Sequence, residues 1–213
     1  MRAATQVSGR PMQFGPRSAV TGFLARTLLW FAAALTLWYL ARDWVVVPPA
    51  WLAEHAMLRA FPEWVRGADL AGQMQTLQTS LTVVAPDGRI GEATVEAGLL
   101  KYCYGTALFV ALLLASWPHG VGWKLPLGIA ALVPFQAFSI CADWLLHVAT
   151  GLGPSTAVQT GFGPVNTNLI GAAYQLGFLI LPTLVPVLLW LALDRKLVAT
   201  VLLEGALSGF RAR

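Results

Sequence analysis

The sequence predicts an all-α polytopic membrane protein, a bundle of four transmembrane helices with a small insertion made of one helix and a β-hairpin. Three observations favour this fold class. Hydrophobic residues make up 57% of the 213 residues, and charged residues only 11%. The charges lie between long apolar runs. Four of these runs approach or reach the roughly 20 residues that a helix needs to cross the hydrocarbon layer. Lipid is therefore the expected solvent of much of the chain.

The first predicted span covers residues 22–47 and follows a basic tail at residues 1–21. The apolar run continues into Trp38 without a small-residue cleavage site. This favours an uncleaved spanning helix over a signal peptide. Because proline disrupts a helix interior, we expect Pro48 and Pro49 to end this helix.

Residues 48–98 form the one sizeable extramembrane segment, and seven of the ten acids lie in it or just before it. Within it, residues 50–65 place apolar side chains at near-helical spacing with a tryptophan at each end. This pattern is typical of a helix on a membrane surface. The runs 75–84 and 90–95 flank Pro86-Asp87-Gly88 and predict a strand, a turn and a strand. Since a lone hairpin is marginally stable, we expect it to pack on the membrane domain or on a partner.

Three further spans are predicted at residues 99–117, 125–149 and 168–193. Gly, Pro, Thr and Asn are frequent in residues 150–167, which predicts a loop before the last span. Residues 194–213 form a second basic tail. Within the last span, prolines 182 and 186 predict a kink.

Basic residues near the span ends indicate the orientation. Nine of the fourteen Lys and Arg residues lie in the two tails, near the start of the first span, and beside the short turn at Lys124. The positive-inside rule then puts both termini in the cytoplasm of a bacterial-type inner membrane, and residues 48–98 in the periplasm. The net charge of +4 is not gathered on an amphipathic face, which argues against nucleic acid as a partner.

Asp143 and His147 are the most conspicuous candidates for chemistry, because ionisable groups within a span are costly unless they are paired. They are four residues apart on one predicted helix and can touch. Cys103, at the outer end of the second span, reaches the same leaflet. A thiol, an imidazole and a carboxylate can serve as nucleophile, general base and orienting group. In the structural alternative, Asp143 satisfies a neighbouring donor, His147 reaches the headgroups and Cys103 is a packing residue. A contact with a ligand or partner is the third possibility.

Two glutamines are candidates for a hydrogen bond across the bundle, with substrate binding as the alternative. Gln136 and Gln175 lie on facing predicted spans, where lipid offers no other partner. Asn166 and Asn168 follow Gly163-Pro164 and predict a turn and a cap for the last helix. The alternative for both asparagines is a polar site at the outer mouth of the bundle.

Tyr102 and Tyr104 fit the aromatic belts that lie at membrane interfaces. The sequence contains no Gly-rich phosphate loop, no HExxH helix and no Cys/His cluster with metal-ligand spacing. We therefore expect neither a cofactor nor a metal site.

The segment VEAGLLKYCYG, residues 95–105, leads from the predicted strand pair directly into a span. In this order of parts the chain resembles the exosortase/archaeosortase family. In that family a Cys-x-Gly at the outer start of a helix follows a strand-rich extracytoplasmic segment. Its cysteine is the nucleophile that cleaves C-terminal sorting signals. Cys103, Tyr104 and Gly105 match this local pattern.

The later spans depart from the exosortase pattern. The family has an arginine near the outer end of the next span and a histidine in a later one. Here the third span has Gln136, Asp143 and His147 but no arginine, and the fourth span has no histidine. Because an acid in place of the arginine reverses the local field, the resemblance implies a degenerate active site.

The runs 99–118 and 168–191 are more similar to the membrane protein that accompanies exosortase H. This resemblance covers residues 75–193. It implies a non-catalytic accessory of a protein-sorting system in the Gram-negative inner membrane. Such a protein would bind the sorting enzyme or its C-terminally anchored substrates. The candidate contact residues are Tyr102, Tyr104, Gly105, Gln136, Asn168 and Gln175.

Two other functions stay open. One is a membrane cysteine transpeptidase or protease that uses Cys103 with His147. The other is a small transporter or channel subunit. The transporter or channel is weakened because the spans show no convincing inverted repeat and contain only one acid, Asp143, away from their ends.

Overall fold

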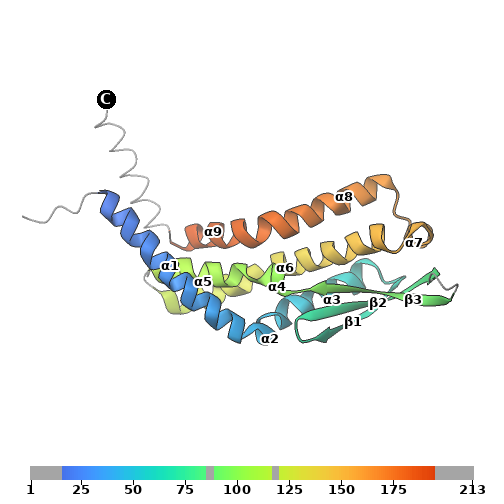
Figure 1. The fold of residues 1–213 in the computed structure, drawn as a ribbon, viewed down its shortest axis with the longest axis horizontal. Coiled ribbons are helices and arrows are strands. Elements are labelled where there is room, and N and C mark those ends of the chain that lie inside the picture. Colours follow the sequence, from blue (N-terminus) through green and yellow to red (C-terminus); the bar gives the residue numbers. More distant parts are fainter. Residues whose placement is uncertain (1–15, 85–88, 117–119, 195–213) are drawn as a thin grey trace, which may run out of the picture.

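The computed structural model describes residues 16–84, 89–116 and 120–194. In this part the elements follow in the order α1 (Pro16–Leu40), α2 (Arg42–Val45), α3 (Val47–Ala60), β1 (Val65–Ala71), β2 (Met74–Val84), β3 (Ile90–Gly98), α4 (Leu100–Cys103), α5 (Gly105–Ser116), α6 (Val121–Gly151), α7 (Pro154–Thr160), α8 (Pro164–Gln175), the π-helical turn η1 (Leu176–Ile180) and α9 (Leu181–Leu193). The molecule is elongated, and α6 and the α8–α9 helix run along its length (Figure 1). The start of α1, α5 and α9 lie at one end, and α3 lies with the sheet at the other (Figure 1). We call these the helix end and the sheet end.

Two helices of the described part, Val121–Gly151 and Pro164–Leu193, are long and apolar enough to cross a membrane. At 1.5 Å per residue each is about 45 Å long, so each exceeds the roughly 30 Å of a hydrocarbon core. Leu24–Leu40 and Arg42–Ala60 count as a third span only if the bent pair is taken together, and Leu100–Ser116 is shorter. The prediction of four spans is therefore not confirmed, whereas the mostly helical membrane fold is.

The first helix ends earlier than the sequence predicts. Regular α1 geometry stops at Leu40, and the chain bends by 80° before α2 and α3 continue. Pro48 and Pro49 lie in the first turn of α3, where a missing N–H breaks no intrahelical hydrogen bond. The prediction that these prolines end a helix is wrong, because they begin one.

The extramembrane segment contains a three-stranded antiparallel sheet in the order β1-β2-β3, where the sequence predicted a two-stranded hairpin. Strand β2 pairs with β3 around Leu77 and Val95, as expected. The predicted turn at residues 86–88 lies outside the described residues. Strand β1 was not predicted, because its sequence does not alternate regularly between apolar and polar residues. A tight connection joins it to β2, with Gly72 in the left-handed region at φ 60°.

One face of the sheet packs against α3 and α6 and forms the larger of two apolar cores. Its fully buried members include Leu77, Leu81, Met57 and Trp144. The Gln75 side chain ties the layers together by donating to the Ala50 carbonyl at 3.2 Å. A second core, formed by α5, α6 and α9, lies toward the helix end. Helix α6 contributes to both cores and thus joins the two ends of the molecule.

The segment predicted as a loop, residues 150–167, is largely helical. Helix α6 continues to Gly151, the short helix α7 follows, and α8 already begins at Pro164. The regular α-helical hydrogen-bonding pattern of the last helix is interrupted at η1, which ends two residues before Pro182. Here the Ser139 hydroxyl lies 2.9 Å from the Gly177 carbonyl oxygen, and this side-chain contact accompanies the π-helical turn.

Candidate functional site

A buried carboxylate lies where the sheet meets the helices. The Asp143 side chain is 0% exposed, and Lys101 Nζ lies 3.0 Å from its Oδ2. The predicted contact with His147 is also present, because Nδ1 lies 3.4 Å from Asp143 Oδ1. A carboxylate without solvent needs such partners, since an uncompensated charge in this position is strongly unfavourable. Sequence reasoning assigned no role to Lys101. A lysine near the start of one predicted span and an acid within another are the signal that could have indicated the pair.

The elements hold this ion pair in a defined position. The Leu99 amide donates to the Gln73 carbonyl at 2.9 Å, which fixes the exit of β3 against the β1–β2 connection. Lys101 follows in α4, while α6 presents Asp143 and His147 one turn apart. His147 Nδ1 is also 2.8 Å from the Asp143 backbone oxygen, so it donates within its own helix. Its other ring nitrogen is then free to interact at the surface, where half of the side chain is exposed.

Aromatic rings surround the lysine. Lys101 Nζ lies 5.0 Å from the centre of the Tyr102 ring and 6.0 Å from that of Phe178. Phe178 in turn stacks on Tyr174 with their centres 5.7 Å apart. Ring faces attract a cation, so they stabilise the ammonium group beside the carboxylate. The Lys101 side chain thus brings together α4, α6 and η1.

Cys103 is not joined to this pair. Its side chain is 0% exposed and belongs to the larger core, together with Leu99, Tyr102 and Ile140. Among the described residues no hydrogen bond or ion pair connects the Cys103 thiol to Asp143 or His147. The structure thus brings two of the three predicted catalytic candidates together and leaves the thiol in apolar surroundings.

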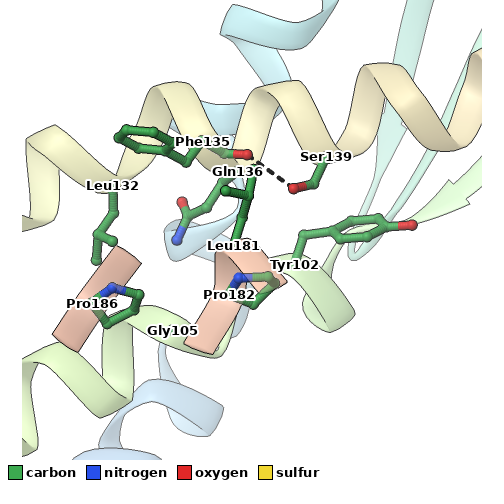
Figure 2. A pocket seen from close by; sticks show the side chains of 9 residues that line it. All are labelled: Tyr102, Gly105, Leu132, Phe135, Gln136, Ser139, Leu181, Pro182 and Pro186. Atoms are coloured by element: carbon green, nitrogen blue, oxygen red, sulfur yellow. Dashed lines mark hydrogen bonds between the residues drawn. The ribbon is translucent and has the colours of Figure 1, made fainter. Parts of the chain in front are cut away.

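The predicted hydrogen bond across the bundle exists but has another partner. Gln136 Nε2 donates to Thr106 Oγ1 at 2.9 Å in a buried contact between α6 and α5. Gln175 is exposed on α8. Figure 2 shows Gln136 beside a cavity of about 10 Å³ between α5, α6 and α9. That volume holds about one water molecule, so it does not accommodate a substrate.

The other predicted contact residues have varied positions. Gly105 lies against α9, where a Cβ atom would meet the Pro182 carbonyl oxygen at 2.5 Å. The glycine therefore permits two helices to approach closely. Tyr104 is half-buried, and Asn168 is exposed within α8. The cap position of α8 is Gly163 without a side-chain hydrogen bond, so the prediction that Asn166 and Asn168 cap this helix is wrong.

An apolar groove of about 530 Å³ lies between α3, α6 and α8. Its walls include Leu52, Met57, Phe61, Phe138, Leu145 and Ile170. The volume is in the range of small-molecule sites, but the walls provide contact area without groups that act on a substrate. Sequence reasoning did not find the groove, because it arises from three segments far apart in the chain.

The comparisons with known proteins agree with the resemblance seen in the sequence. No curated protein and no solved structure matches the chain significantly. The model of one family, described as exosortase H-associated membrane protein, matches residues 17–197. The match begins in α1 and extends past the end of α9. The chain therefore belongs to the family of exosortase H-associated membrane proteins.

Proposed function

We propose that this protein is a non-catalytic accessory of an exosortase-type sorting system in the bacterial inner membrane. It acts by binding the sorting enzyme or the C-terminally anchored substrate of that enzyme. The family match carries this proposal, because the members of the family are described as exosortase H-associated membrane proteins.

The surroundings of Cys103 support a role without catalysis. A nucleophilic cysteine reacts as a thiolate and needs access to its substrate. Cys103 is instead enclosed in the apolar core beneath the sheet. The Asp143 carboxylate faces the Lys101 ammonium group at 3.0 Å, so it is not reserved for orienting a catalytic imidazole.

The sheet offers a surface for binding. One face is buried on α3 and α6, while the other carries exposed polar side chains such as Gln78, Glu92, Thr94 and Glu96. With both basic termini in the cytoplasm, this face lies in the periplasm. A partner that binds this face would contact acids and amides on a three-stranded sheet.

Photo-crosslinking in living cells tests the proposal. A photoreactive amino acid at Thr94, on the outer face of the sheet, is expected to give an adduct containing the exosortase or its substrate. The same group at the exposed Val158 of α7 is the matched control and is expected to give much less. No adduct from Thr94, together with purification of the chain without either partner, would contradict the accessory role.

Substitution of Cys103 distinguishes the accessory role from the cysteine transpeptidase or protease. Cys103→Ala is expected to leave substrate sorting and co-purification unchanged, because the thiol only packs. Loss of sorting with an intact complex would favour the cysteine transpeptidase or protease instead. Alkylation of native Cys103 by a small hydrophilic reagent would point the same way.

A further inference from the structure

An exposed apolar stripe crosses the bend between α1 and α3. Its members recur at intervals of three and four residues, so within each helix they lie on one side. They are Leu37, Leu40, Trp44, Val47 and Trp51. Leu40 is 74% exposed, Trp44 83% and Trp51 59%, which are high values for side chains of this size.

The fold does not need this stripe for its core. Helix α3 meets α6 and the sheet with other residues, and Ala50, Ala53 and Met57 are the buried ones. The surface helix predicted within residues 50–65 groups Trp51 with Leu52, Leu58 and Phe61 at near-helical spacing. The structure packs these three against the core and leaves Trp51 outside.

The bend decides which kind of partner fits the stripe. Since the axis turns by 80° at Ala41, a straight helix of a partner could follow only one of the two arms. A lipid surface is fluid and can cover both. The first arm is the end of α1 itself. Exposed leucines earlier in this helix, among them Leu24, Leu28 and Leu29, are typical of a membrane helix.

We propose that the bend is embedded in the outer leaflet of the membrane. Leu37 and Leu40 lie in the hydrocarbon, and Trp44 and Trp51 lie at the level of the phospholipid headgroups. Tryptophan prefers that zone because its ring is apolar and its N–H remains near water. Polar side chains next to the bend are consistent with a position at the headgroups. The Arg42 guanidinium lies 4.5 Å above the Tyr39 ring, and Asp43 accepts a hydrogen bond from Gln73 at 3.1 Å.

This placement fixes how deeply the protein sits in the membrane. With 25 residues, α1 extends about 37 Å, enough to cross the hydrocarbon with moderate tilt. The outer boundary then passes at Ala41, and α3 extends from it with the sheet toward the sheet end (Figure 1). The Trp51 ring is held in place by His55, with the ring centres 4.2 Å apart.

Spin labels measure this depth directly. The full chain carries a nitroxide at Trp44→Cys or Trp51→Cys, in a Cys103→Ala and Cys141→Ala background. It is reconstituted alone into vesicles of phosphatidylethanolamine and phosphatidylglycerol. Both labels are expected to collide more with oxygen than with a water-soluble nickel chelate. Matched labels at Val158→Cys and Thr94→Cys are expected to show the reverse.

Three outcomes overturn the proposal. The first is that labels at 44 and 51 behave like the label at 158. The second is that they are shielded from both reagents in native membranes, which indicates a protein partner on the stripe. The third concerns unlabelled protein, in which brominated lipid quenches the fluorescence of tryptophans that lie in the membrane. If the double variant Trp44→Phe and Trp51→Phe shows the same degree of quenching as the native chain, the two rings are not in the membrane. Because the vesicles contain no exosortase, failure here is distinguishable from failure of the accessory role.

Discussion

At the scale of single residues, the pair of Lys101 and Asp143 is asymmetric. The carboxylate is fully buried, whereas 38% of the lysine side chain is exposed and can turn toward water. Removal of the lysine therefore leaves a buried charge, while removal of the acid leaves a charge that can be solvated. For this reason, substitution of Lys101 alone and of Asp143 alone should lower the free energy of unfolding by different amounts.

We expect Lys101→Met to lower the free energy of unfolding by about 3 kcal/mol, and Asp143→Asn by about 1 kcal/mol. The double variant Lys101→Met with Asp143→Leu should recover most of the loss, because no charge is left unpaired. Unfolding by SDS, followed by circular dichroism, measures all three. Equal losses in the two single variants would contradict the asymmetry.

Gly105 shows how one missing side chain sets a helix contact. Gly105→Ala is expected to cost about 1–3 kcal/mol, because the new Cβ would press on the backbone oxygen of Pro182. Gly171→Ala is the matched control in α8, where nothing lies within 4 Å of the new Cβ. That change should be neutral or slightly stabilising. A scan of melting temperature compares the two, and equal shifts would count against close packing at Gly105.

At the scale of elements, α7 completes the edge of the sheet through one side chain. Gln159 Oε1 accepts from the Thr82 amide at 2.9 Å, and Gln159 Nε2 donates to the Thr82 carbonyl at 2.9 Å. The glutamine thereby pairs with β2 where the ladder between β2 and β3 shifts its register, between Gln78 and Thr82. Strand β1 pairs with β2 only as far as Thr79, so this amide satisfies the backbone groups of Thr82 where β1 has ended.

Gln159→Ala is expected to raise the hydrogen-exchange rate of the Thr82 amide about tenfold, equivalent to about 1.4 kcal/mol for a lost hydrogen bond. Exchange followed by mass spectrometry on peptides of β2 measures it. Gln175→Ala, at an exposed position of α8, is the control and should leave β2 unchanged. Unchanged exchange at Thr82 in the first variant would show that the contact adds no protection.

At the scale of the whole molecule, two apolar cores share one long helix. The core at the sheet end contains Cys103 and packs against Cys141, while that at the helix end is formed by residues such as Phe109 and Trp190. The helices of the second core are enclosed by a micelle after extraction, but the sheet faces water. Urea acts on groups exposed to water, so the sheet end should lose its structure first.

We therefore expect both thiols to react with a maleimide in urea before the helical circular dichroism signal is lost. Two separate transitions, one by thiol labelling and one by ellipticity, would support independent cores. Coincident transitions would show that α6 couples the two ends into one cooperative unit.

The sequence by itself determined the membrane class, the family and much of the local structure. Long apolar runs produce long helices because the backbone must satisfy its hydrogen bonds without water. The alternation near Leu77 and Val95 produced the expected pairing of β2 with β3. The contact between Asp143 and His147 also followed from a spacing of four on one helix.

Tertiary structure alone decided which residues meet across segments. Lys101 pairs with Asp143, Gln136 pairs with Thr106, and Cys103 faces the core, and each of these contacts joins residues at least 30 positions apart or packs the thiol against other segments. The 80° bend at Ala41 and the strand β1 are likewise set by packing that local patterns do not encode. Periodicity determines the face on which a residue lies, but only the packed chain determines what that face contacts.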